Sequence, residues 1–195
     1  MVQLRIQLGL GVLIAIAVAF AVTAPAAPRG VEPGAPSVEN GAYVFDAAGC
    51  ASCHSAPLSE DRLMLSGGKP FDTQFGVFYA PNISMHPIYG VGDWTLADFE
   101  QALRQGVSPD GQHYFPVFPY TTYQNMSDQD VRDVWAYMKT LPTSDQPNLP
   151  HNVAFPFSVR RSIGGWKLLF MPSAHVDIAD RGQYLVDALG HCAEC

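Results

Sequence analysis

The chain has 195 residues, which is enough for one ordinary domain or two small ones. Its net charge of −7 argues against nucleic acid as a partner, because nucleic-acid-binding surfaces are basic. The 17 glycines and 16 prolines indicate a loop-rich protein with short helices rather than a bundle of long ones.

The first 27 residues have the pattern of an export sequence. Arg5 precedes an apolar run over residues 8–22, and small residues then follow up to Ala27. These are the three parts of a signal peptide. Extended through Ala27, the run approaches the ~20 residues that cross a bilayer, so an uncleaved membrane anchor is the alternative. In either case we expect residues 28–37 to be a tether and the rest to lie in the periplasm, soluble or anchored to the outer face of the cytoplasmic membrane.

The first predicted element of the mature chain is a helix over about residues 38–48, with apolar positions at helical spacing. Directly after it, Cys50, Cys53 and His54 form the motif C-A-S-C-H. Two thiols at this spacing can form thioethers with the two vinyl groups of one porphyrin, and the next residue offers an imidazole to the iron. We therefore predict haem c bound covalently at Cys50 and Cys53, with His54 as an axial iron ligand.

Two other uses of the cysteines fit the sequence less well. A thioredoxin-like redox pair expects a βαβ context, which this part of the chain does not show. A zinc site with four cysteine ligands would have to join pairs about 140 residues apart, far more than such motifs usually span.

Two further helices are predicted in the same domain. Thr95 is a good N-cap for a helix that ends at Gly106. Ser127 caps a third helix, whose first turn is acidic, and Pro142 lies beyond its end. An all-α domain over residues 38–142, with the haem motif after its first helix, is the arrangement of a class I cytochrome c domain.

The rest of the chain repeats the beginning of this domain. Residues 143–178 are proline-rich and then apolar, and we interpret them as an interdomain connection packed on the first domain. The pattern G-x-Y-x-x-D-A begins at Gly41 before the first cysteine pair and recurs at Gly182 before the second. The second copy has one extra residue between this pattern and its cysteines. Such a repeat predicts that residues 179–195 begin a second cytochrome c domain.

The second cysteine pair, Cys192 and Cys195, stands at the end of the sequence. It would bind a second haem c only if the natural chain continued with histidine. We therefore expect the sequence to be part of a longer protein with at least two haems. A chance repeat at a natural C-terminus is the alternative.

The second axial ligand of the iron has two candidates. Methionine commonly lies opposite histidine in electron-transfer haems, but the loop over residues 107–125 contains none. Met126 stands just beyond this loop, where a hydrophobic residue also commonly packs back on the following helix. His113, within the loop, is the other candidate.

Together these motifs resemble the dihaem and trihaem cytochrome c subunits of bacterial membrane-associated dehydrogenases. The resemblance covers residues 38–195 and rests on the haem motif, Phe75-Gly76, Ala80-Pro81-Asn82-Ile83, Gly90-Val91-Gly92-Asp93-Trp94, Phe118-Pro119-Tyr120, Met126-Ser127-Asp128, Gly182-x-Tyr184-Leu185-Val186 and Gly190-His191-Cys192-x-x-Cys195. In that family a Met-Pro-Tyr stands in place of Phe118-Pro119-Tyr120, and its methionine is the expected ligand. Phenylalanine cannot bind iron, so this chain departs from the family there.

The resemblance implies an electron carrier rather than an enzyme. Its expected partners are a dehydrogenase subunit as donor, and the quinone pool or a terminal oxidase as acceptor. The alternative is a haem-based enzyme such as a thiosulfate dehydrogenase or peroxidase, which needs an open iron position beside a polar pocket. The aromatic residues of the loop and its lack of clustered Arg or Lys favour the carrier.

Overall fold

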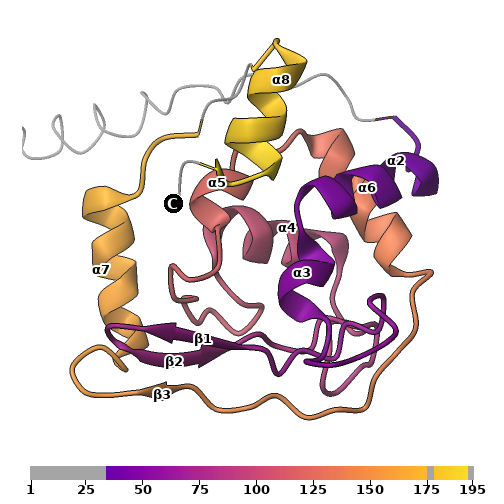
Figure 1. Ribbon diagram of the computed structural model, residues 1–195. Coiled ribbons are helices and arrows are strands. Elements are labelled where there is room, and N and C mark those ends of the chain that lie inside the picture. Colours follow the sequence, from indigo (N-terminus) through magenta and orange to yellow (C-terminus); the bar gives the residue numbers. More distant parts are fainter. Residues whose placement is uncertain (1–33, 175–177, 193–195) are drawn as a thin grey trace, which may run out of the picture. The chain divides into compact units, whose positions relative to one another are not determined.

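The computed structural model describes residues 34–174 and 178–192 (Figure 1). The predicted export sequence and most of the predicted tether therefore lie outside the described residues. The helices are α2 (Val38–Ala47), α3 (Cys50–His54), α4 (Leu96–Gln105), α5 (Tyr120–Tyr123), α6 (Asp128–Met138), α7 (Arg160–Phe170), α8 (Arg181–Tyr184) and the π-helix η1 (Leu185–Leu189). Within the described residues, no helix is long and apolar enough to cross a membrane.

The three helices predicted for residues 38–142 are confirmed with nearly the expected bounds. Thr95 caps α4 in a capping box with Asp98, and the helix ends at Gly106 in the left-handed conformation (φ 60°). Ser127 caps α6 by accepting a hydrogen bond from the Asp130 backbone N–H. These ends were predictable because capping depends on residues a few positions apart.

Helices α2 and α6 form the main helix pair of the domain. They touch at Gly41, where an added Cβ would lie only 2.0 Å from the carbonyl oxygen of Asp133. The Asn40 side-chain amide donates to carboxylate oxygens of Asp130 (2.9 Å) and Asp133 (2.7 Å) across the contact. A glycine thus sets the close approach, and the buried carboxylates hold the two helices in register.

A small antiparallel sheet is an addition to the predicted all-α fold. Strands β1 (Pro70–Thr73), β2 (Gly76–Tyr79) and β3 (Asn152–Val153) pair in that order. The first two strands have four residues each, and burial does not alternate along either of them, so no two-residue period marks them in the sequence. The third joins from far along the chain, so its partner has no local signal in the sequence.

The predicted helix over residues 179–189 is present as α8 followed directly by η1 (Figure 1). In η1 the Gly190 N–H donates to the Leu185 carbonyl at 2.7 Å, which is a π-type bond. A π-turn holds one residue more than an α-turn. The extra residue of the second repeat is therefore accommodated inside the helix.

This C-terminal helix packs into the same core as α2 and α6. Ala188 and Leu189 are fully buried there. The Tyr184 hydroxyl accepts from the Ser127 N–H (2.9 Å) and donates to Asp130 (2.6 Å). The repeat, predicted as the start of a second domain, is thus fastened to the first domain along residues 178–192.

The α2–α6 contact gives a test of the fold with a matched control. We expect Gly41→Ala to lower the free energy of unfolding by about 3 kcal/mol, because the methyl group would meet a backbone carbonyl that cannot move alone. Gly165→Ala in α7 meets no atom within 4 Å and should raise stability by about 0.5–1 kcal/mol through helix propensity. Urea denaturation followed by circular dichroism measures both, and equal effects would contradict the packing described here.

Candidate functional site

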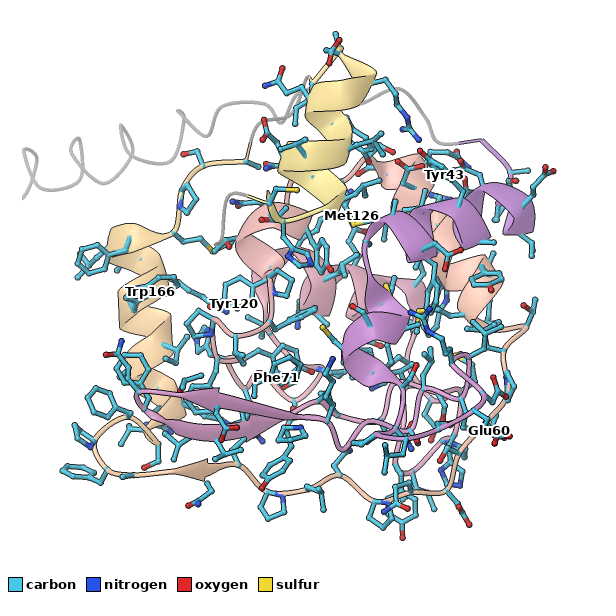
Figure 2. The ribbon with its side chains drawn as sticks, viewed as in Figure 1. Tyr43, Glu60, Phe71, Tyr120, Met126 and Trp166 are labelled. Atoms are coloured by element: carbon cyan, nitrogen blue, oxygen red, sulfur yellow. The ribbon has the colours of Figure 1, made fainter. Side chains whose placement is uncertain are left out.

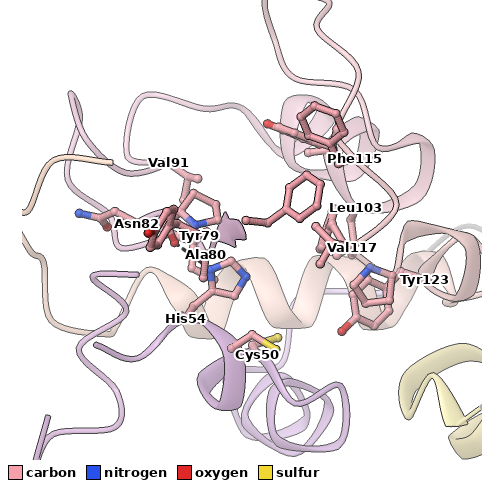
Figure 3. A pocket seen from close by; sticks show the side chains of 18 of the residues that line it. Cys50, His54, Tyr79, Ala80, Asn82, Val91, Leu103, Phe115, Val117 and Tyr123 are labelled. Carbon is pink, nitrogen blue, oxygen red and sulfur yellow. Dashed lines mark hydrogen bonds between the residues drawn. The ribbon is translucent and has the colours of Figure 1, made fainter. Parts of the chain in front are cut away.

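A cavity of about 520 Å³ lies between α3, α4, the sheet and the aromatic loop before α5 (Figure 3). This volume is within the range of ligand and cofactor sites. Its wall is mainly aromatic and aliphatic, with side chains that include Phe71, Phe78, Val91, Trp94, Phe99, Leu103, Phe115, Val117, Phe118, Tyr123 and Val134. The cavity therefore suits a large, mostly apolar ligand.

The predicted haem motif lies on one side of this cavity. Gly49 separates α2 from α3 by adopting the left-handed conformation (φ 69°). Within α3, Cys50, Cys53 and His54 occupy positions i, i+3 and i+4, which share one helix face. All three line the cavity. The short helix thus presents two sulfurs and one imidazole to the same space.

The tautomer of His54 follows from the hydrogen bond that its side chain makes. Its Nδ1 lies 2.8 Å from the carbonyl oxygen of Pro81, and a carbonyl can only accept, so Nδ1 donates (Figure 3). The other ring nitrogen, Nε2, then has a free lone pair. Desolvation lowers the pKa of His54, against a smaller opposing effect of this hydrogen bond. A neutral imidazole oriented by a carbonyl is the usual form of a metal-ligating histidine.

The Pro81 carbonyl is held in place by the next residue, the buried Asn82. The backbone N–H of Asn82 donates to Asn148 Oδ1 (2.6 Å), and its side-chain amide donates to the carbonyls of Ser144 and Gln146 (both 2.9 Å). The loop that orients His54 is therefore fixed by residues 144–148. Those residues lie within the segment 143–178, which we predicted to be an interdomain connection.

The two cysteines are chemically available. Cys50 and Cys53 are free thiols, and desolvation raises the pKa of Cys50 to about 12. Two thiols on one helix face, with an imidazole beside them, fit haem c: the sulfurs match its two thioether bonds and the imidazole matches an axial iron ligand.

The two predicted candidates for the second axial ligand lie in different places. Met126, labelled in Figure 2, is buried and lines the cavity. It also packs in the core, so its role as a hydrophobic contact before the Ser127 cap is consistent with the same position. His113 is not part of the cavity wall. Its Nδ1 lies 3.4 Å from the Nζ atom of Lys167, on α7.

His191 lines the cavity, although no role was predicted for it. It directly precedes Cys192, as Gly49 precedes Cys50, and it shares the left-handed conformation of Gly49 (φ 40°). Its Nε2 lies 3.9 Å from where a Cβ on Gly49 would stand. A histidine in this strained conformation costs free energy. The comparison of the two repeats, aligned at their cysteines, was the only sequence signal that could have pointed to it.

His151 and Arg160 are two further cavity residues that were not predicted. His151 precedes β3, and its ring packs at the edges of Phe78 and Phe115, with centroids 5.4 and 5.6 Å away. Arg160 begins α7, with its guanidinium carbon 5.2 Å from the centre of the Phe115 ring. Both residues reach the cavity from beyond residue 142, where no local pattern marked them.

Comparison with known proteins matches residues 38–142 to the cytochrome c family. The chain is 51% identical over 163 residues to a diheme cytochrome c-type protein of Cereibacter sphaeroides, covering 80% of this chain and 55% of that protein. It is 36% identical over 180 residues to the fructose dehydrogenase cytochrome subunit of Gluconobacter japonicus, covering 88% of this chain and 37% of that protein.

Another relative is the cytochrome c subunit of the quinone-dependent alcohol dehydrogenase of Gluconacetobacter polyoxogenes. It is 34% identical over 168 residues, which cover 81% of this chain and 35% of that subunit. The chain thus spans about half, or less, of the length of the relatives it matches.

The Asn82 contacts give a test of how the site is supported. We expect Asn82→Asp to lower the free energy of unfolding by about 3 kcal/mol or more, because a buried carboxylate would face two carbonyl oxygens to which the amide donates. Asn152→Asp, at an exposed position of β3, makes the same chemical change and should alter stability by less than about 0.5 kcal/mol. Thermal unfolding measures both variants. An equal fall in the midpoint temperature of Asn82→Asp and Asn152→Asp would contradict this account.

Proposed function

This chain belongs to the cytochrome c family, and we propose that it is a periplasmic electron carrier with haem c at Cys50 and Cys53 and His54 as an axial iron ligand. The observation that carries the proposal is the joint position of these three residues on one wall of an apolar cavity. The hydrogen bond from His54 to Pro81 supports it, because that bond leaves Nε2 as a lone-pair donor.

Haem c, when bound, supplies an iron that exchanges single electrons between its ferrous and ferric states. The chain's own residues hold that iron and set its surroundings. His54 is held in one tautomer, and the aromatic side chains of the wall would surround the haem and limit its contact with water. Exclusion of water favours the less charged, reduced state, so this wall contributes to a higher reduction potential.

We propose a membrane-associated dehydrogenase as the electron donor. This follows the relatives, which are named as cytochrome subunits of fructose and alcohol dehydrogenases. The quinone pool or a terminal oxidase is the proposed acceptor. The pattern of residues 1–27 supports export to the periplasm, with the chain either free or anchored there.

We propose Met126 as the second axial ligand. Of the two candidates, Met126 is buried in the cavity wall, whereas His113 lies against α7 and accepts a hydrogen bond from Lys167. Methionine opposite histidine is a common ligand pair in electron-transfer cytochromes.

We also propose a second haem c at Cys192 and Cys195, in a longer natural chain that continues with histidine. The repeat before the two cysteine pairs supports it, as does the printed name of the diheme relative. The packing of residues 178–192 on the first domain would hold Cys192 close to the first site, with His191 as its direct neighbour in the cavity wall. Cys195 itself lies outside the described residues.

Covalent attachment is the direct test of the proposed function. We expect the chain, exported to a periplasm that matures c-type cytochromes, to carry haem that survives denaturation. The double variant Cys50→Ser/Cys53→Ser should lose that haem completely, because no thioether can form. Haem-stained denaturing gels and mass spectrometry measure attachment. The matched control, Cys192→Ser/Cys195→Ser, should keep the first haem, and retention of covalent haem by the first variant would refute the site.

Optical spectra test the second ligand. We expect Met126→Leu to abolish the weak far-red absorption band that sulfur-to-iron coordination produces in ferric cytochromes, and to lower the reduction potential, since thioether ligation raises it. His113→Asn should leave the band and the potential unchanged. The opposite pattern, with the band absent from the unmodified protein or lost only in the His113 variant, would exclude Met126.

A further inference from the structure

The cavity wall contains one formally charged side chain. Among its described residues, Arg160 is the only lysine, arginine, aspartate or glutamate. It lies beside Phe115, and Figure 3 shows Phe115 on the far side of the cavity from Cys50. A single positive charge is therefore placed at the end opposite the cysteines.

His151 adds a hydrogen-bond donor near the same end. Its Nδ1 accepts from the Tyr79 backbone N–H at 3.2 Å, so a neutral ring must have its proton on Nε2. Desolvation and the nearby Arg160 charge both lower the pKa of His151, which favours this neutral form. The Nε2–H has no hydrogen-bond partner among the described residues.

Arg160 is also without an ion pair in the part of the chain that the structure describes. Asp110 already accepts hydrogen bonds from the Ser108 hydroxyl and the Gln112 side-chain amide. A half-buried guanidinium with no ion pair, at the wall of an apolar cavity, is available to bind an anionic group of a ligand.

The positions of both residues are fixed by contacts elsewhere. Lys167, on the same helix as Arg160, donates to the carbonyls of Gln105 and Gly106 at the end of α4, at 2.6 and 2.7 Å. Strand β3, which follows His151, pairs with β2. The two side chains therefore belong to a prepared site and not to a loosely attached segment.

We propose that Arg160 and His151 bind the propionate groups of the haem, an inference that rests on the proposed function. A porphyrin attached through its vinyl groups at Cys50 and Cys53 has its two propionates on the opposite edge. These are carboxylates, which a guanidinium binds through two parallel hydrogen bonds and which an imidazole N–H can also bind. The cavity thus has a covalent end and an anion-binding end, and the second lies outside residues 38–142.

The same arrangement sets the direction of an electrostatic effect. Oxidation adds a positive charge at the iron, and the Arg160 charge opposes it. Arg160 therefore raises the reduction potential of the haem and offsets the effect of the propionates.

Neighbouring arginines allow a matched experiment. Arg160→Gln should lower the midpoint potential measured by spectroelectrochemistry and shift the propionate bending mode in the resonance Raman spectrum. Arg161→Gln, the adjacent and exposed residue, removes the same charge outside the cavity wall and should leave both nearly unchanged. Arg160→Lys should restore the potential in large part, because it keeps the charge but not the planar fork.

His151→Asn provides a second variant if Arg160→Gln does not fold. The asparagine oxygen can still accept from Tyr79, but the donor at Nε2 is removed, so the Raman mode should again shift. The propionate site alone would be overturned if Arg160→Gln, Arg161→Gln and His151→Asn all carried covalent haem and all had the midpoint potential and Raman spectrum of the unmodified protein. Absence of covalent haem from the unmodified protein would instead refute the proposed function.

Discussion

The hydrogen bond from His54 Nδ1 to the Pro81 carbonyl joins the two parts on which the site depends. One part is local: a short helix that begins at a left-handed glycine and presents Cys50, Cys53 and His54 on one face. The other part is the loop around Asn82, whose conformation depends on residues 144–148. Without that loop the imidazole would have no fixed tautomer, and the ring could rotate away from the cavity.

The segment over residues 143–178 therefore does more than connect two repeats. It fixes the loop that orients His54, it adds strand β3 to the sheet, and it brings His151 and Arg160 to the cavity. These residues lie beyond the part of the chain that matches the cytochrome c family, residues 38–142. The family-matched domain supplies Cys50, Cys53 and His54, whereas the following segment supplies the polar groups at the opposite end of the cavity.

In the second repeat, one inserted residue does not prevent the helix from packing in the core of the first domain. The extra residue before Cys192 is held in a π-turn, so the helix continues and Ala188 and Leu189 still reach the core. At its end, His191 adopts a conformation that glycine holds in the first repeat. The result is that the residue before the second cysteine pair lies in the wall of the first cavity.

The sequence by itself determined the haem motif, the three capped helices and the repeat before the second cysteine pair. Each of these depends on residues within a few positions of one another: a C-x-x-C-H spacing, a Thr95 or Ser127 cap, an apolar period. The tertiary structure alone decided that Met126 lies in the cavity wall while His113 lies against α7, that a small sheet closes one side, and that His151, Arg160 and His191 line the cavity. The physical reason is that these placements depend on contacts between segments far apart in the chain. His151 is hydrogen-bonded to Tyr79, and Lys167 is hydrogen-bonded to Gly106. No periodicity or spacing in the sequence predicts such long-range contacts.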